Sequence, residues 1–315
     1  MQTVKSPLKH PKPRKTYTRQ QSLRKFMNSI ILQLAQVGRT RTSQTYRITL
    51  NSFMNFTARD IMLNEIDTQL LMEYESHLKN RRLTRNTISF YMRILRAVFN
   101  RAVELGLTEQ TQPFKRVYTG VEKTIKRALS EDIIRKIIKL NLPPDSSEEF
   151  ARDIFLFSFY TRGMSFIDIA FLRKTDLANN TLTYRRSKTN QLLSIRWEKC
   201  MQDIIDKYSA EKSPYLLPII TSATNERRQY ESKLRLINNN LKKISKMLSL
   251  TSPITMYVAR HSWASIAKNK SIPLSIISQG MGHDSETTTK IYLTSLDSSV
   301  IDDANSIIIN SIKEI

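Results

Sequence analysis

Apolar residues in the first third of the chain recur with the period of an α-helix. They fall at intervals of three and four residues in runs that span Phe26–Leu34, Tyr46–Phe56, Thr68–Leu78 and Asn86–Leu105, the spacing of helices that bury one face. Gly106 follows the last run directly, in the place where glycine commonly ends a helix. The pattern predicts a small bundle of four helices.

The rest of the chain is predicted to be mostly helical, with one interruption. Residues Thr181–Arg186 and Leu192–Trp197 favour strands, and the polar segment Ser187–Gln191 between them completes the pattern of a β-hairpin. A helix is expected to begin at Ser130, because serine is a good N-cap residue and two acidic residues follow in the first turn. The expected fold class is therefore mainly α, with a small hairpin in the second half.

Changes in this pattern predict the domain boundaries. Residues 1–16 hold three prolines among basic residues, so we expect a flexible basic arm. The helical bundle should occupy 17–115, and the basic segment 116–129, which has no apolar period, is the predicted linker. A second domain is expected at 130–295, and 296–315 has the apolar pattern of a C-terminal helix. That helix could dock onto a neighbouring copy or pack within its own domain.

The charge of the chain indicates a polyanionic partner. Its 315 residues include 50 Lys and Arg against 28 Asp and Glu, a formal net charge of +22, and no acidic residue occurs before Asp60. Such an excess favours a nucleic acid, although basic residues can also merely solvate helix faces. The residues expected to contact the partner are Lys5, Lys9, Lys12, Arg14, Lys15, Arg39, Arg41, Arg85, Arg93 and Arg96. An anionic membrane would require a strongly apolar opposite face, which the segment before Tyr17 lacks.

Composition limits the other classes of protein. Hydrophobic residues make up 40% of the chain, enough for a buried core, but no stretch approaches the roughly 20 consecutive apolar residues that a membrane-spanning helix needs. The start of the chain is polar and basic, unlike a secretory signal, so we expect a cytoplasmic protein. The single Cys200 and four scattered histidines have no zinc-type spacing, and we expect no structural metal.

Residues suited to phosphate chemistry gather near the C-terminus. In Gly280-Met281-Gly282-His283 the two glycines permit a tight turn that presents His283, and Tyr292 lies nine residues downstream. Tyr257 and Arg260 are three residues apart, on one face of a predicted helix. Arg260 is the best candidate to neutralise a phosphodiester, because a guanidinium stays charged and offers a planar set of donors; a surface ion pair is the alternative.

The order and spacing of these residues resemble the tyrosine recombinases, or phage-type integrases. Their catalytic domain carries an arginine box, a lysine in a hairpin turn, a His-x-x-Arg helix, a Gly-His pair and a nucleophilic tyrosine. The matching positions are Tyr160–Leu172, Lys188, Tyr257 with Arg260, Gly282-His283 and Tyr292. The resemblance extends from about Tyr17 to the C-terminus, since the helical first half is similar to the family's SAM-like core-binding domain. Phe157–Met164 and Tyr257–Trp263 most resemble the Bacteroides-type integrases and DNA invertases.

The resemblance implies a site-specific recombinase that acts on double-stranded DNA. Tyr292 would attack a backbone phosphate and become linked to its 3′ side, and the released 5′ hydroxyl would then attack the phosphotyrosine of a partner strand. Because the bond energy is retained, no metal, ATP or other cofactor is implied. Recombination of two sites implies a homotetramer, in association with the nucleoid. Integration, excision and inversion all remain open.

The resemblance also assigns roles to single residues. Lys188 would protonate the leaving 5′ oxygen, and His283 would donate a hydrogen bond to the phosphate. Tyr292, with an ordinary pKa of roughly 10, needs neighbouring cations or a base to lose its proton. Arg260 and Tyr257 are the nearby candidates.

Two positions depart from the family pattern. Ser165 stands where the family has its first arginine, and Arg162, about one helical turn earlier, would supply the guanidinium if the backbone stays helical. Tyr257 stands where a histidine is usual, which leaves a phenol that donates and accepts one proton. Asp168 is expected to orient an arginine or a backbone group.

Two other functions are alternatives, and the two departures favour the first of them. A DNA-binding regulator that has lost catalysis is one, although the presence of Lys188, Arg260, His283 and Tyr292 together argues against it. A topoisomerase with the same nucleophile is the other, and the sequence dependence of cleavage would distinguish it.

Overall fold

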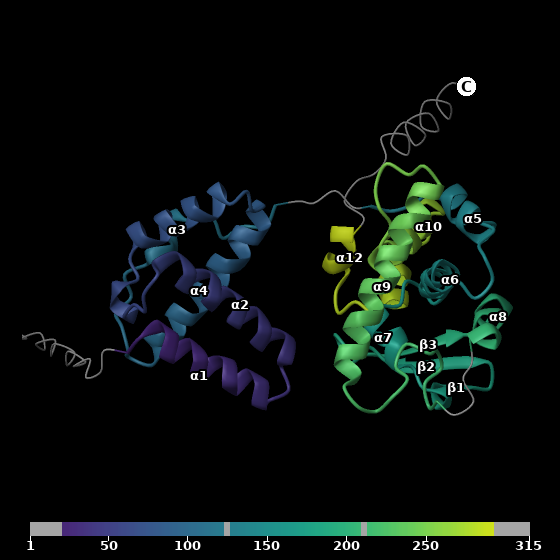
Figure 1. The fold of residues 1–315 in the computed structure, drawn as a ribbon, viewed down its shortest axis with the longest axis horizontal. Helices are drawn as coiled ribbons and strands as arrows, with labels where there is room; N and C mark the ends of the chain where they lie inside the picture. The colour runs from purple at the N-terminus through teal and green to yellow at the C-terminus, as the bar shows by residue number, and fades with distance from the viewer. Residues whose placement is uncertain (1–20, 123–126, 209–212, 293–315) are drawn as a thin grey trace, which may run out of the picture. The chain divides into compact units, whose positions relative to one another are not determined.

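The computed structural model describes residues 21–122, 127–208 and 213–292 (Figure 1). The chain divides into two compact units, Met1–Thr124 and Ile125–Ile315. The predicted arm, 1–16, and the predicted C-terminal helix, 296–315, lie outside the described residues. In the part of the chain that is described, no helix has both the length and the apolar character needed to cross a membrane.

The first unit is a bundle of four α-helices, as the apolar period predicts. Its elements are α1 (Leu23–Gln36), α2 (Thr40–Thr57), η1 (Leu63–Glu65), α3 (Thr68–Asn80), α4 (Arg85–Glu104) and η2 (Pro113–Arg116). Polar caps explain where three helices begin, because Ser22, Asp67 and Thr84 each accept a hydrogen bond from a backbone N–H of the first turn. The predicted bounds are close to the observed ones for α3 and α4, whereas α2 begins at Thr40, well before Tyr46.

The core of this unit is aromatic at its centre and extends further along the chain than predicted. Tyr74 is fully buried edge-on to Phe53, with ring centroids 4.8 Å apart. Phe114 and Val117 are buried in the same core, and the Glu122 N–H donates to Asn86 Oδ1 of α4 at 2.8 Å. Residues 116–122 of the predicted linker therefore belong to the bundle, because segments without a helical period still fill its core.

The second unit surrounds a central helix with other helices and a small sheet. Its helices are α5 (Glu131–Ile138), α6 (Ser147–Tyr160), α7 (Phe166–Phe171), η3 (Lys174–Asp176), α8 (Lys199–Tyr208), α9 (Glu226–Met247), α10 (Met256–Asn269), α11 (Leu274–Met281) and α12 (Glu286–Tyr292). Ser130 caps α5 as predicted, accepting from the Ile133 N–H. Helix α6 packs against α5, α8, α9 and α10, and the sheet lies at one edge of the unit, beside α8 (Figure 1).

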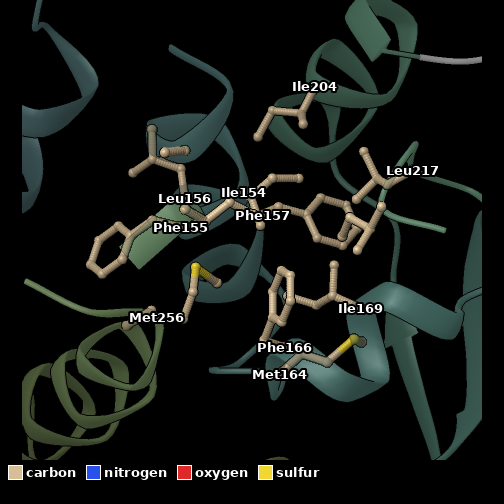
Figure 2. Close-up of a cluster of buried hydrophobic side chains, with 14 of the residues drawn as sticks. Ile154, Phe155, Leu156, Phe157, Met164, Phe166, Ile169, Ile204, Leu217 and Met256 are labelled. Atoms are coloured by element: carbon tan, nitrogen blue, oxygen red, sulfur yellow. The ribbon is translucent and has the colours of Figure 1, made fainter. Parts of the chain in front are cut away.

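Helix α6 is apolar on most sides, as a central helix must be. Ile154, Phe155 and Phe157 are completely buried. Figure 2 shows these side chains in the middle of the core, with Phe166 of α7 and Ile204 of α8 beside them. This core fixes the end of α6, where the chain turns toward α7.

The predicted hairpin is present and gains a third strand. Strands β1 (Leu177–Ala178), β2 (Thr181–Arg185) and β3 (Leu192–Arg196) form an antiparallel sheet in the order β1-β2-β3. Leu182 pairs with Ile195, and both side chains are buried. The segment Ser187–Gln191 forms the turn between β2 and β3.

Candidate active site

The turn from α6 to α7 forms one wall of the candidate site. Helix α6 ends at Tyr160, and the backbone then takes the left-handed conformation at Arg162 (φ 61°) and Gly163 (φ 71°). A Cβ at Gly163 would lie 2.7 Å from the Cα of Arg260, so only glycine lets α10 pass this closely. The turn and α10 are therefore packed backbone against backbone.

Arg260 links this turn to the end of α11. Its side chain is buried, with 3% of the residue exposed. Nη1 donates to the Gly163 carbonyl at 2.8 Å, and Nη2 donates to the Met281 carbonyl at 2.6 Å. Nη2 also lies 2.9 Å from His283 Nε2. The predicted cation is thus held at the meeting point of three segments that are far apart in sequence.

His283 is presented by a tight glycine turn, as predicted. Gly282 has a left-handed backbone (φ 65°), and the His283 N–H returns to the Ser278 carbonyl at 3.1 Å, which ends α11. The imidazole is buried, and its Nδ1 lies 2.7 Å from Thr289 Oγ1 of α12. The ring is therefore fixed through both nitrogens.

Burial and nearby cations keep His283 neutral. They lower its pKa from 6.5 to about 4; burial has the largest effect, followed by Arg260, Arg186 and Lys188. An imidazolium would be repelled by all three cations and poorly solvated. At neutral pH the ring therefore carries a single N–H.

The hairpin of β2 and β3 also contacts the turn that presents His283. Arg186, directly after β2, is only 6% exposed, and its Nη1 donates to the Gly282 carbonyl. Thr189 Oγ1 also approaches that carbonyl, at 3.4 Å. Lys188 between them is exposed. Its charge contributes to the low pKa of His283, so the predicted lysine lies on the His283 side of the site.

Arg186 is the cation that sequence reasoning missed. Its signal is the two-residue period of a strand: Leu182, Tyr184 and Arg186 are all buried, on one face. An arginine at the third inward position of such a series is unusual, because buried charges require partners. Among the basic residues of the hairpin, the sequence pattern had predicted a role only for Lys188.

Arg162 does not lie where it was expected. The condition on which Arg162 would supply the guanidinium, a helical backbone from Arg162 to Ser165, is not met, because the left-handed turn at Arg162 and Gly163 separates α6 from α7. Arg162 is half-buried, and its Cδ lies 3.6 Å from the position that a Cβ at Gly280 would take. Its side chain thus passes beside Gly280 of α11.

Asp168 orients a backbone group, as predicted. Ser165, the N-cap residue of α7, donates its hydroxyl to Asp168 Oδ2 at 2.6 Å. Asp168 Oδ1 accepts the Ser187 N–H at 2.8 Å. The buried carboxylate therefore ties the base of the hairpin turn to α7 and keeps Lys188 near the site.

Tyr257 and Arg260 share a cavity but differ in exposure. A cavity of about 250 Å³ is lined by both residues and by Ser165. Tyr257 is 54% exposed and packs edge-on to His261 at 4.6 Å, whereas Arg260 is buried. The two residues therefore line the same cavity, as expected for one helical face, but only Tyr257 is exposed to solvent.

Tyr292 is the last residue of α12, and nothing beyond its backbone belongs to the described part of the chain. Helix α12 packs against α10 and α11. The helix that ends at Tyr292 thus contacts both the helix that carries Arg260 and the helix that precedes His283.

Comparison with known proteins identifies the family. Residues 22–125 match the phage integrase SAM-like domain, and residues 127–299 match the phage integrase family. The chain belongs to the phage integrase family. It is a site-specific DNA recombinase, an enzyme that cleaves and rejoins DNA, as the sequence predicts. No curated protein matches the sequence closely enough to count as a relative.

Solved structures of recombinases share the fold of this recombinase. A lambda integrase dimer bound to a COC′ core site has 16% identity and a TM-score of 0.66, over 87% of this chain and 77% of that chain. The Tn1549 transposon integrase in complex with a circular intermediate DNA has 15% identity and a TM-score of 0.65, over 90% and 99%. XerH bound to its difH substrate has 18% identity and a TM-score of 0.58, over 84% and 79%.

Two predicted DNA-contacting arginines of the recombinase also hold its bundle together. Arg85 lies 4.3 Å from the centroid of the Tyr118 ring and pairs with Glu122 at 3.6 Å. Arg96 Nη1 donates to Thr119 Oγ1 at 3.0 Å. Both side chains thus fasten the segment after η2 to α4, which limits their freedom to reach a phosphate.

Three other predicted contacts are exposed. Arg39 and Arg41 lie at the start of α2, and Arg93 lies on the outer face of α4. The remaining predicted contacts, Lys5, Lys9, Lys12, Arg14 and Lys15, lie outside the described residues. The described part of the bundle therefore offers α2 and α4 as its basic surfaces.

Proposed function

We propose that Tyr292 is the nucleophile of this recombinase and that Arg260, His283, Lys188 and Arg186 bind and neutralise the phosphate that it attacks. The observation that supports this assignment is that Arg260, Arg186 and His283 lie together at the end of α11. Arg260 donates to the Met281 carbonyl and Arg186 donates to the Gly282 carbonyl, the two consecutive carbonyls that directly precede His283. Few sites other than a phosphate would require two buried guanidiniums beside a neutral imidazole.

Electrostatics favours these residues for phosphoryl transfer. Attack on a phosphodiester adds negative charge to the non-bridging oxygens, so fixed cations stabilise the transition state more than the ground state. Arg260 and Arg186 are 3% and 6% exposed, and an environment with little water strengthens their attraction for the phosphate. Both guanidiniums are already held beside His283 before DNA binds.

Arg186 is our assignment for the guanidinium that Ser165 cannot supply. It is buried, it bonds beside His283, and its charge lowers the pKa of that histidine. Arg162 remains the second candidate, since it is half-buried and its side chain approaches Gly280. The two candidates lie on different segments, and separate alanine substitutions distinguish them.

The reaction follows from these roles. The Tyr292 hydroxyl gives its proton to water and its oxygen bonds to phosphorus, while the bond from phosphorus to the 5′ oxygen breaks. Lys188 gives a proton to that oxygen. The product is a 3′-phosphotyrosine and a free 5′ hydroxyl, and attack by the 5′ hydroxyl of another strand reverses the steps and releases Tyr292.

We also infer the assembly and the subgroup. A lambda integrase structure of the same fold is a tetramer bound to a Holliday junction, which supports four copies of this chain on two double-stranded DNA sites. The segments Phe157–Met164 and Tyr257–Trp263 support a Bacteroides-type integrase or invertase. A catalytic domain at 130–295 holds every proposed catalytic residue, and a net charge of +22 supports association with the nucleoid.

The test is covalent trapping. Nicked duplexes built from inverted repeats that flank the gene prevent religation, so wild type should accumulate a protein-DNA adduct that survives denaturation. Tyr292→Phe should form none, yet bind the same DNA as tightly as wild type. An adduct that persists in Tyr292→Phe would assign the nucleophile to another residue.

A further inference from the structure

Thr289 holds a hydrogen bond that none of the roles above explains. It is fully buried in α12, and its Oγ1 lies 2.7 Å from His283 Nδ1. It precedes Tyr292 by three residues, less than one helical turn. A buried threonine could as easily be a valine of nearly the same shape, so the hydroxyl rather than the volume needs an explanation.

The partners of His283 determine where the ring carries its proton. Arg260 Nη2 lies 2.9 Å from Nε2, and a guanidinium has no lone pair with which to accept. Nε2 must therefore be the accepting nitrogen, which leaves the proton on Nδ1. That N–H donates to Thr289 Oγ1. His283 is thus held as the Nδ1–H tautomer. In this form Nε2 has no proton to donate to a phosphate.

A hydroxyl serves both forms of the ring. It accepts when Nδ1 carries the proton, and it donates when Nδ1 is bare, by rotation of its own hydrogen. A carbonyl or carboxylate at this place would fix the Nδ1–H form, and an ammonium would fix the other. Threonine at 289 therefore lets the ring proton of His283 reside on either nitrogen. Nε2 can then act as an acceptor or as a donor.

The geometry points to Thr289 as a positioning residue that orients His283 and supports its change of tautomer when DNA binds. This inference rests on the proposed role of His283. A bound phosphate draws the guanidinium of Arg260 onto its own oxygens and presents an acceptor to Nε2. The N–H bond at Nδ1 then breaks and one at Nε2 forms through exchange with water, while the Thr289 hydroxyl turns to donate to Nδ1. The ring keeps one proton throughout.

The same bond connects the imidazole to the helix of the nucleophile. Thr289 belongs to α12, which ends at Tyr292, and α12 contacts α10 and α11. A displacement of α12 would therefore move the partner of His283 as well as the backbone of Tyr292. The phosphate ligand and the nucleophile are positioned by one short helix.

The charged groups around the ring make pH an informative variable. Arg260 faces it from α10, and Arg186 and Lys188 face it from the hairpin. These cations oppose protonation, so the neutral ring should persist well below neutral pH in wild type. Loss of the Thr289 hydroxyl changes the relative stability of the two neutral forms and leaves the surrounding charge unchanged.

The first experiment measures single-turnover cleavage of nicked duplexes across pH. Thr289→Val should lower the rate at least about tenfold, since partners that orient a functional imidazole usually contribute this much, with DNA affinity and melting temperature close to those of wild type. Its pH profile should keep the wild-type shape, because the two neutral forms of the ring carry the same number of protons. Thr289→Ser should retain most of the activity that Thr289→Val loses.

The matched control is Thr288→Val. Thr288 is the preceding residue of α12, and its Oγ1 lies 3.3 Å from Ser285 Oγ, away from His283. This variant should cleave at the wild-type rate. Wild-type cleavage by Thr289→Val would overturn the inference. Equal losses in Thr289→Val and Thr289→Ser, together with a lower melting temperature, would overturn it too, because they would mean that Thr289 only packs.

A second measurement does not depend on activity. Nitrogen-15 shifts of the imidazole distinguish the tautomers, and the chain has only four histidines, so His283→Gln assigns the signal. Wild type should show protonated Nδ1 without DNA and protonated Nε2 with an uncleavable duplex, and Thr289→Val should lose that response. An unchanged response in Thr289→Val contradicts the inference. An adduct in Tyr292→Phe would instead overturn the proposed nucleophile and leave this result standing.

Discussion

Substitution of Arg186 tests the site most directly. Arg186→Ala removes one buried cation whose Nη1 bonds to the Gly282 carbonyl. Two unit charges about 4 Å apart interact by about 4 kcal/mol at an effective dielectric constant of about 20. Since about 1.4 kcal/mol corresponds to a factor of ten in rate, the expected loss in cleavage is about 10²- to 10³-fold. Loss of a single oxyanion donor in other enzymes has a similar effect.

The assay separates chemistry from binding. Single-turnover cleavage of a nicked duplex gives the rate, and a mobility shift gives the affinity, which should fall far less than the rate. Arg186→Lys should restore part of the activity, because it returns the charge without the planar pair of donors. The pKa of His283 should rise above about 4 in Arg186→Ala, since Arg186 is one of the cations that lower it.

Arg162→Ala is the matched comparison. It removes a guanidinium from the same unit at a half-buried position beside Gly280. We expect a loss of less than about tenfold, because a more exposed cation is better screened. Cleavage within threefold of wild type by Arg186→Ala, with a hundredfold loss in Arg162→Ala, would refute the reasoning and give the role to Arg162.

Two further substitutions test the packing and the electrostatics of the site. Gly163→Ala should lower the free energy of unfolding in urea by about 1–3 kcal/mol more than Gly106→Ala: both glycines have positive φ, but only a Cβ at 163 meets a neighbour, the Arg260 Cα at 2.7 Å. Equal losses would show that the close approach to α10 is not needed. Because the pKa of His283 falls from 6.5 to about 4 on folding, its contribution to stability is complete above about pH 6.5 and is lost as the pH falls toward 4. Wild type should therefore lose up to about 2 kcal/mol more than His283→Gln between pH 7.5 and 5, and parallel curves would contradict the shift.

The elements of the fold could be predicted because local patterns specify them. Helices α1 to α4 have clear apolar stripes, and Ser130 marks the start of α5 with a side-chain cap. The hairpin was predictable from two β-type runs around a polar turn. Val117 was assigned to the linker because its segment has no period, yet tertiary packing buries it. Local pattern does not show such contacts.

The candidate site was predictable in its members but not in its arrangement. Arg260, His283 and Lys188 were found by type and spacing. Arg162 was misplaced because the helical rule assumes a continuous backbone, whereas the close approach of α10 to Gly163 requires a left-handed turn. Arg186 was missed because its partner, the Gly282 carbonyl, is 96 residues away in the sequence.

The way α11 ends affects how the cations of the site are held together before DNA binds. Arg260 and Arg186 donate to the last carbonyls of this helix, at Met281 and Gly282, where the aligned peptide dipoles place about half a negative charge. These carbonyls act as counter-ions while DNA is absent, and they cannot be protonated. These carbonyls carry less negative charge than a phosphate. DNA that binds therefore has to displace only a partial charge from the guanidiniums, and not the full charge of a carboxylate. The enzyme can thus keep its cations together at rest and still release them to its substrate.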